Sequence, residues 1–315
     1  MEEYRKPALT FDEQIGLLKS RGLDIPDVER ARRHLSNVSY YRLSAYMLPF
    51  KKRGEDGKPI DEFLEGTTWD DVYDLYKFDR KLRLLFFDAI ERIEVALRTQ
   101  EVYQLSLKYG SHWQDDRSVF KEDRNGFSYF GCISYSIQNA LRDNKNVVFI
   151  KHYREKYCSP INPPSWMCLE LLYFRDLSII YRDLAKRSDR LSLSKAFGVR
   201  NDRVFSSWLH TINYVRNVCA HHARLWNITL NITPSKFYNY NRSDKVWLSG
   251  REVDMAQRSK IYYFICILLF LLQTVNPKTK FRQHFMDLLK NYPNVDVGFM
   301  GFPIGWEDHP LWKMQ

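Results

Sequence analysis

The feature that most constrains the fold is a long run of helical periodicity. It begins at the capping residues Thr68 and Asp71 and continues to Gly110. Within it, apolar side chains recur at spacings of three and four, which places them on one face of an α-helix. These side chains are Val72, Leu75, Leu82, Phe86, Ala89, Ile93 and Leu97. A helix of about forty residues is far longer than the average globular helix, so we expect it to be the central element of the fold.

The remainder of the chain also reads as helices, without an internal repeat or a clear strand pattern. Three short helices precede Pro49, and later helical stretches are expected near 132–143, 146–157, 165–187, 202–221, 258–275 and 279–291. The sequence therefore predicts an all-α fold, with a long loop over 229–250. The predicted parts are an N-terminal helical subdomain (1–50), a polar, Gly-rich linker loop (51–67), a helical domain (68–292) and an aromatic tail docked on the core (293–315).

Cysteine usage and hydropathy predict a cytoplasmic protein. The five cysteines are scattered and form no C-x-x-C pair, which argues against a disulfide framework and fits a reducing compartment. The N-terminal "MEEYRKPALTF" lacks the apolar core of a signal peptide. The longest apolar run, Ile261 to Leu272, is too short to span a bilayer and predicts a buried helix.

Charge and aromatic content favour a polyanionic partner. The net charge is +10 and aromatics make up 15% of the residues, and lysine, arginine and aromatic rings together suit phosphates and unpaired bases. Net charge is a weak indicator of a protein's binding partners, however, and most runs of charged residues are solvent-exposed surfaces. The basic segments that could hold an RNA backbone are Arg30–Arg33, Lys186–Arg190 and Arg200–Arg203.

The segment "NYVRNVCAHHARLWN", residues 213–227, concentrates the candidate chemistry near the end of the 202–221 helix. At 100° per residue, one face of this helix is apolar and the other carries a polar edge about 60° wide. The apolar stripe is Phe205, Trp208, Ile212, Val215 and Cys219, and the polar edge is Arg203, His210, Tyr214, Asn217 and His221.

Two details of spacing matter for catalysis. Asn217 and His221 are one turn apart, so the amide could hydrogen-bond one ring nitrogen and fix the tautomer of the other. Arg216 lies about 140° from His221 around the helix. For the two to cooperate, the guanidinium must reach round, the helix must end near Ala220, or a second subunit must complete the site.

Other interpretations of the candidate polar residues were compared with a catalytic site. A solvated polar face is what any amphipathic helix shows. A zinc site would have only one plausible ligand pair, Cys219 with His222, and we expect no metal. There is no G-x-S-x-G motif, which argues against a serine nucleophile. There is also no Gly-rich phosphate loop, so we expect no nucleotide cofactor. Glu91 and Glu94 with Arg98 suggest an ion-pair network rather than an acid–base couple.

Five segments, in order, resemble the Abi_2 family of abortive-infection proteins of the AbiD/AbiF type. They are "LTFDEQIGLLKSRGLDI", "LSNVSYYRLSAYMLPF", "LYKFDRKLRLLFFDAIERIEVALRTQ", "VRNVCAHHARLWN" and "MGFPIGWEDHPLW". The resemblance implies a HEPN-like helical bundle, commonly dimeric, and in many members a metal-independent ribonuclease. The HEPN motif maps onto Arg216, Asn217 and His221, with His222 as the alternative histidine. Members of the AbiF type are often encoded beside a structured non-coding RNA, which implies a ribonucleoprotein.

HEPN nucleases normally place two arginine–histidine motifs in one site, whereas this chain has one convincing copy, so two chains would have to pair. The leading hypothesis is thus a homodimeric anti-phage HEPN ribonuclease, with Arg216 as phosphate clamp, His221 as general acid/base and Asn217 as its orienter. Weaker substrate-binding candidates are His210, Tyr214, His222, Arg224 and Arg203. The alternatives are an RNA-binding protein that does not cut, and a HEPN toxin that transfers or accepts nucleotide groups.

Overall fold

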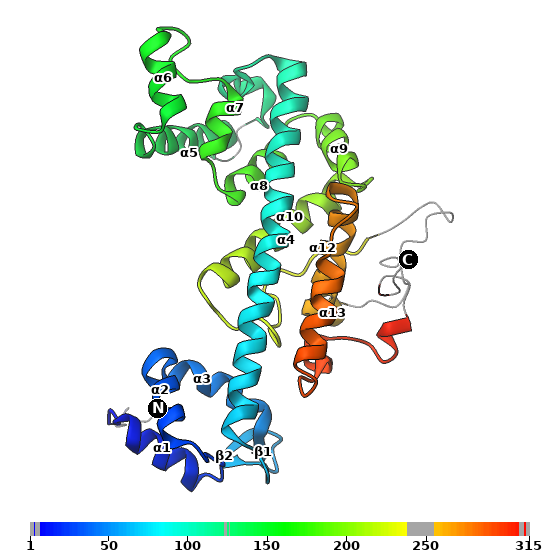
Figure 1. Cartoon of the computed structure of the whole chain (residues 1–315). Helices are drawn as coiled ribbons and strands as arrows, with labels where there is room; N and C mark the ends of the chain where they lie inside the picture. Colours follow the sequence, from blue (N-terminus) through cyan, green and yellow to red (C-terminus); the bar gives the residue numbers. More distant parts are fainter. Residues whose placement is uncertain are drawn as a thin grey trace. The chain divides into compact units, whose positions relative to one another are not determined.

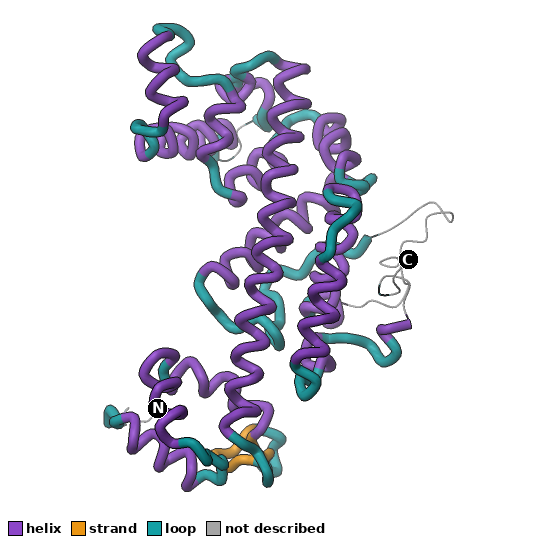
Figure 2. The backbone as a smooth tube through the Cα atoms, viewed as in Figure 1, coloured by secondary structure: helices purple, strands orange, loops and turns teal. Residues whose placement is uncertain are grey.

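The structure, a computed structural model, describes residues 3, 7–122, 125, 127–237, 255–308 and 312. It divides into two compact units. Unit 1 comprises residues 1–83 and 285–296, and unit 2 comprises residues 84–284 and 297–315. Helices dominate both units, and the strands of the described residues form one small hairpin (Figures 1 and 2).

The predicted all-α fold is confirmed, with that hairpin as the addition. The α-helices are α1 (Phe11–Ser20), α2 (Val28–Val38), α3 (Tyr40–Met47), α4 (Trp69–Tyr109), α5 (Tyr129–Asp143), α6 (Val148–Lys156), α7 (Ser165–Cys168), α8 (Phe174–Asp183), α9 (Arg187–Ala196), α10 (Asp202–Ala220), α11 (Met255–Arg258), α12 (Ile261–Val275) and α13 (Phe281–Asn291). The 3-10 turns are η1 (Leu48–Phe50), η2 (Trp113–Asp115), η3 (Arg117–Val119), η4 (Leu169–Leu171), η5 (Val297–Met300) and η6 (Trp306–Asp308).

Helix α4 is the long helix that the periodicity predicts, with 41 residues. Its start is fixed reciprocally, since the Thr68 backbone N–H donates to the Asp71 carboxylate and the Asp71 N–H donates back to the Thr68 hydroxyl. Gly110 follows its last residue in the left-handed conformation that ends many helices. All seven apolar residues named for its periodic stripe are buried. The helix contributes its first part to unit 1 and the rest to unit 2.

Unit 1 has a polar centre inside its apolar core. The hydroxyl of Tyr46 on α3 donates to Asp79 of α4 at 2.5 Å, and Arg83, one turn further along α4, also pairs with Asp79. Asp79 is fully buried and Arg83 nearly so. Burial and the Asp79 charge raise the pKa of the Tyr46 hydroxyl, so this tyrosine stays protonated and acts as a hydrogen-bond donor.

Residues 51–67 contain a hairpin where the sequence predicted only loop. Strands β1 (Lys51–Arg53) and β2 (Pro59–Phe63) pair antiparallel, with Lys51 opposite Phe63. Cross-strand ion pairs join Lys51 to Asp61 and Lys52 to Glu62. Strands this short and this exposed leave no apolar alternation for sequence analysis to detect. The domain boundaries proposed from sequence stay a prediction.

Unit 2 holds the apolar helices and the aromatic C-terminal segment. Helix α12 is buried along most of its length, and no described helix is long and apolar enough to cross a membrane. Rings of Phe302, Trp306 and Trp312 pack together and against Tyr262 of α12. The predicted loop over 229–250 falls partly on residues 238–250, which lie outside the described residues.

The single helix expected over 165–187 is wrong, because the chain is interrupted in the middle. Helix α7 and turn η4 end at Leu171, residues 172 and 173 are extended, and α8 then starts at Phe174. The sequence of this break contains no glycine or proline. At the break, Arg98 of α4 donates hydrogen bonds to carbonyl groups that a continuous helix would have used internally.

Candidate functional site

Helix α10 presents the two faces expected from its sequence. Asn201 caps its start by accepting hydrogen bonds from the Arg203 and Val204 backbone N–H groups. The five residues of the predicted apolar stripe are all buried, and Phe205 packs between the rings of Tyr181 and Phe197. The polar edge faces outward, with Arg203, His210, Asn217 and His221 exposed and Tyr214 half-buried.

The histidine pair lies where α10 ends. Ala220 is the last helical residue, His221 is the C-cap, and His222 adopts a left-handed backbone with φ of 55°. The His222 N–H donates to the Cys219 carbonyl, and the Ala223 N–H donates to the Val218 carbonyl. These two bonds are those of a Schellman motif, in which the left-handed position usually belongs to glycine. Here a histidine occupies it.

Arg216 and Asn217 line a pocket between α10 and the start of α8. Its volume is about 250 Å³. The lining comes from two segments, with Tyr173, Phe174, Arg175 and Asp176 on one side and Asn213, Arg216 and Asn217 on the other. The predicted phosphate clamp and the predicted orienting amide are therefore brought together, and we call this cavity the arginine pocket.

The arginine pocket is electropositive. Within the described part of the chain, neither Arg175 nor Arg216 pairs with a carboxylate. The first turn of α8, which has no side-chain cap on its free N–H groups, forms part of the wall. A helix N-terminus and two guanidinium groups are features that bind phosphate. Asp176 contributes one negative charge to the same wall.

Arg98 of α4 fixes the segment from which α8 starts. Its Nε donates to the Leu169 carbonyl at 3.0 Å, and its Nη2 donates to the Leu172 carbonyl at 3.1 Å. The same guanidinium pairs with Glu94 at 3.1 Å, which confirms this part of the expected ion-pair network. Glu91, its other expected member, is exposed and makes no ion pair in the described structure. Arg98 thus ends η4 and sets the direction in which Tyr173 and α8 leave it.

The histidines do not line the arginine pocket within one chain. His221 and His222 are exposed at the end of α10, beyond the residues that form the cavity. No hydrogen bond between the Asn217 amide and the His221 ring occurs in the described structure; the two residues are joined only by the His221 N–H and the Asn217 carbonyl, at 2.9 Å.

The weaker candidates are spread along the same helix. Arg203 and His210 are exposed on earlier turns, Tyr214 is half-buried, and none of the three lines the arginine pocket. Arg224 is half-buried in the segment after the helix. Their roles in substrate binding stay predictions.

Two of the basic segments proposed for RNA are engaged in ion pairs. Arg30 pairs with Asp70 and Arg32 with Asp12. In the second segment, Arg187 and Arg190 both contact buried Asp202 at 3.2 Å. Arg200 and Arg203 of the third segment are exposed. The third segment therefore has the more available charge.

The α8 side of the pocket, formed by Tyr173, Arg175 and Asp176, was not predicted from the sequence. The expectation of one helix over 165–187 placed these residues in a helix interior, where no N-terminus could exist. The available signal was weak: an aspartate, Asp176, in what proves to be the first turn of a helix. Among the described residues, no group of three or more His, Cys, Asp or Glu side chains is placed to hold a metal ion.

The fold and the pocket define a mostly helical protein with an arginine-lined cavity near the end of a histidine-bearing helix. A family model for Abi-like proteins matches residues 33–227, more than half of the chain. The chain belongs to the Abi-like protein family, which is associated with abortive infection, a defence against phage. The match includes α8 and α10 and ends at Asn227, the last residue of the histidine segment. No curated protein and no solved structure matches the chain.

Proposed function

We propose that this protein is a metal-independent HEPN ribonuclease that acts in anti-phage defence as a homodimer, associated with a structured non-coding RNA. The observation that carries the proposal is the arginine pocket. It joins two guanidinium groups without carboxylate partners in the described structure, two asparagine amides and a helix N-terminus. Such a set suits a phosphodiester, whose oxygens accept several hydrogen bonds at once.

The chemistry that this set would support is internal transesterification of RNA. The ribose 2′-oxygen attacks the adjacent phosphorus while a general base removes its proton. The bond from phosphorus to the 5′-oxygen breaks, and a general acid returns a proton to that oxygen. The products are a 2′,3′-cyclic phosphate and a 5′-hydroxyl. Arg216 and Arg175 would stabilise the extra charge on the phosphorane oxygens.

The position of His221 supports the dimeric form of the mechanism. In one chain the exposed histidines lie outside the lining of the arginine pocket, whereas proton transfer requires hydrogen-bond reach of the reacting oxygens. A symmetric dimer could bring the end of one α10, which carries His221 and His222, to the pocket of the other chain, so that each pocket would gain a proton-transfer group from its partner. His222 could take the place of His221 as the proton-transfer residue.

A cleavage assay tests the proposal. RNA is incubated with the full chain in EDTA, and wild type is compared with Arg216→Ala, Arg175→Ala and His221→Ala. We expect wild type to produce cyclic-phosphate ends and the three variants to lose most of this activity. Arg92→Ala is the matched control, because Arg92 lies on the exposed face of α4 and pairs with Asp88; it should cleave like wild type.

Mixing two inactive variants tests the shared site. If each active site combines Arg216 of one chain with His221 of the other, a mixture of Arg216→Ala and His221→Ala chains forms some sites with both residues intact, and activity should partly return. Absence of cleavage by wild type with RNA still bound would contradict the nuclease.

The second candidate function is an RNA-binding protein that does not cut. The observation in its favour is the same separation of His221 from the pocket lining. On this interpretation the arginine pocket grips the RNA backbone and the histidines have no catalytic role. Binding would then depend on Arg175 and Arg216, while His221→Ala would bind like wild type.

A further inference from the structure

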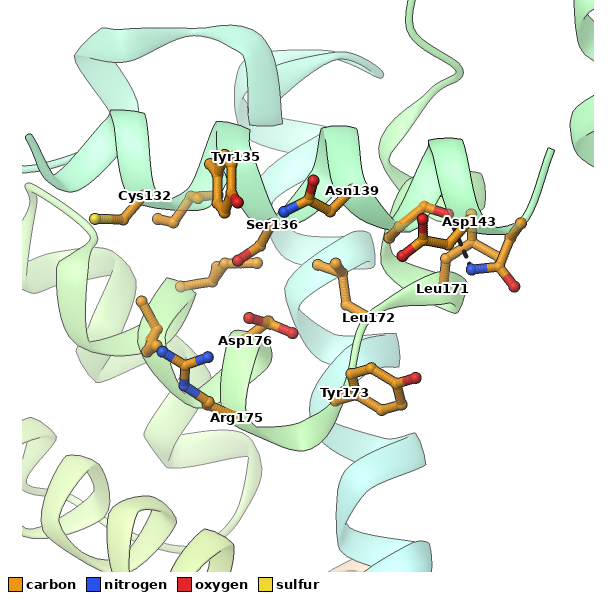
Figure 3. A pocket seen from close by; sticks show the side chains of 15 residues that line it. Cys132, Tyr135, Ser136, Asn139, Asp143, Leu171, Leu172, Tyr173, Arg175 and Asp176 are labelled. Atoms are coloured by element: carbon orange, nitrogen blue, oxygen red, sulfur yellow. Dashed lines mark hydrogen bonds between the residues drawn. The ribbon is translucent and has the colours of Figure 1, made fainter.

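A second pocket, of about 350 Å³, lies beside the arginine pocket in unit 2. It is formed by α5 on one side and by the break before α8, together with α8 itself, on the other (Figure 3). A volume at the lower end of the range for small-molecule sites suits one nucleotide rather than a larger ligand. The two pockets share Tyr173, Arg175 and Asp176, so they are neighbouring parts of one surface.

Three polar groups converge in the second pocket. Figure 3 shows Ser136 and Asn139 of α5 facing Asp176 of α8. All three side chains are half-buried, and in the described structure none of them makes a hydrogen bond to another side chain or to the backbone. A hydroxyl, an amide and a carboxylate with free hydrogen-bonding capacity, held on two packed helices, form a site that can discriminate between ligands by their polar edges.

Exposed aromatic rings accompany these polar groups. Tyr135 and Tyr173 line the pocket and are 70% and 69% exposed. Exposed tyrosine rings beside a polar pocket provide surfaces on which an unpaired base can stack. Tyr173 also lines the arginine pocket, so a base next to this ring would belong to a nucleotide adjacent to the phosphate.

The Asp176 carboxylate indicates which base fits. An ionised carboxylate only accepts hydrogen bonds. Guanine offers two adjacent donors, N1–H and the N2 amino group, on its Watson–Crick edge, and the two carboxylate oxygens can accept both. Adenine and cytosine place a ring-nitrogen acceptor beside their single amino group, and uracil places two carbonyl acceptors beside its N–H. These acceptors would face the carboxylate with like charge.

We infer that the second pocket is a guanine-binding subsite. It takes the base in contact with Asp176, with Asn139 available to donate to the guanine O6, and it selects the RNA nucleotide next to the phosphate held by Arg175 and Arg216. The RNA context rests on the proposed function, whereas recognition of guanine by the pocket itself does not. The chemical class of ligand is a guanine nucleotide.

Binding of mononucleotides tests the inference without any need for cleavage. GMP, AMP, CMP and UMP are titrated into the full chain and followed by calorimetry. Because one bidentate contact is worth about 1–3 kcal/mol of discrimination, we expect GMP to bind roughly tenfold more tightly than the other three. Asp176→Asn should bring GMP close to the others. Asp88→Asn, the same change at an exposed carboxylate of α4, should keep the preference.

A second pair of variants tests stacking. Tyr173→Ala should weaken all four nucleotides by roughly tenfold, and Tyr173→Phe, which keeps the ring, should recover most of that loss. Tyr173 is largely exposed, so both variants should fold, which thermal unfolding checks.

The outcomes separate this inference from the proposed function. A GMP preference that depends on Asp176, without RNA cleavage, would keep the guanine subsite and contradict the nuclease. Cleavage of RNA with equal binding of the four nucleotides would do the reverse. The absence of binding by any nucleotide, or a GMP preference that survives Asp176→Asn, would overturn the subsite.

Discussion

The guanidinium of Arg98 lies 3.1 Å from the carbonyl oxygen of Leu172, and this contact joins the long helix α4 to the residue before the candidate site. Leu172 immediately precedes Tyr173, which lines both pockets. The side chain of Arg98 is only 12% exposed, so its hydrogen bonds to two carbonyls are shielded from water. Arg98 is therefore a positioning residue: it touches no candidate ligand but determines where α8 begins.

Arg98→Ala should destabilise the protein and disturb the arginine pocket. The change removes charge-assisted hydrogen bonds to the Leu169 and Leu172 carbonyls and leaves Glu94 without its cation. We expect the free energy of unfolding to fall by about 2–3 kcal/mol, and RNA affinity to fall with it. The stability and RNA affinity of Arg98→Lys should lie between those of wild type and Arg98→Ala, because one ammonium cannot reproduce the planar set of donors of a guanidinium. Urea unfolding and RNA titration measure the two effects.

Arg92→Ala is the matched control for Arg98→Ala. Arg92 lies on the same helix and pairs with Asp88 at the same spacing of four, but both side chains are about half exposed. Water replaces an exposed ion pair at little cost, so this variant should have the same free energy of unfolding as wild type. Equal unfolding of the two variants would mean that Arg98 does not hold the break before α8.

The elements that follow from a local pattern of apolar residues could be predicted from the sequence. The periodic stripe of α4 and the two faces of α10 are both as predicted, since each follows from the spacing of apolar residues along one helix. The break at Leu172 could not be predicted from local pattern, because the side chain bonded to the carbonyls there is Arg98, more than seventy positions earlier in the chain. Because the break was not predicted, neither was the start of α8, which carries the pocket residues Tyr173, Arg175 and Asp176. The helix face was predictable, whereas the pocket that it shares with α8 was not.

His222→Gly should stabilise the protein. His222 holds the left-handed position of the Schellman motif, with φ of 55°, which costs most residues about 1–2 kcal/mol and glycine little. Histidine tolerates this conformation better than most side chains, so we expect a gain of up to about 1 kcal/mol. His221→Gly should have the opposite sign, because the φ of His221 is −85° and needs no glycine. Urea midpoints of the two variants decide this.

The same two glycine variants assign the catalytic histidine. If His221 is the general acid/base, His221→Gly should lose cleavage while His222→Gly retains it and unfolds at higher urea. If the stabilised His222→Gly protein is the inactive one, His222 is the proton-transfer group. A left-handed histidine at the end of a helix would then be backbone strain kept for function.

The buried group of Tyr46, Asp79 and Arg83 predicts non-additive energies in unit 1. Asp79→Asn leaves the Arg83 charge buried without its counter-charge, and we expect a loss of about 3–5 kcal/mol. Tyr46→Phe removes one donor to Asp79 and should cost about 1.5–3 kcal/mol. The double variant Asp79→Leu with Arg83→Met should recover much of the loss of the single change, because no charge remains buried. A double variant as unstable as the sum of the single changes would contradict this coupling.

Glu101 of α4 predicts how stability changes with pH. It is fully buried, and neither carboxylate oxygen has a hydrogen-bond partner in the described structure. Burial raises the pKa of Glu101 well above its usual range, with only partial opposition from the Arg98 charge. In the folded protein the group therefore keeps its proton at pH values where the unfolded chain, with a pKa of about 4.3, has released it.

The sign of the pH effect follows from this difference in proton binding. The contribution of Glu101 to stability is complete below pH of about 4.3 and is lost as the pH rises toward the folded-state pKa. Glu101→Gln removes the titration, so the stability of this variant relative to wild type should increase from pH 5 to pH 8. Urea unfolding at each pH measures the difference, with Glu91→Gln on the exposed face as control. A difference that stays constant with pH would show that Glu101 is ionised in the folded protein.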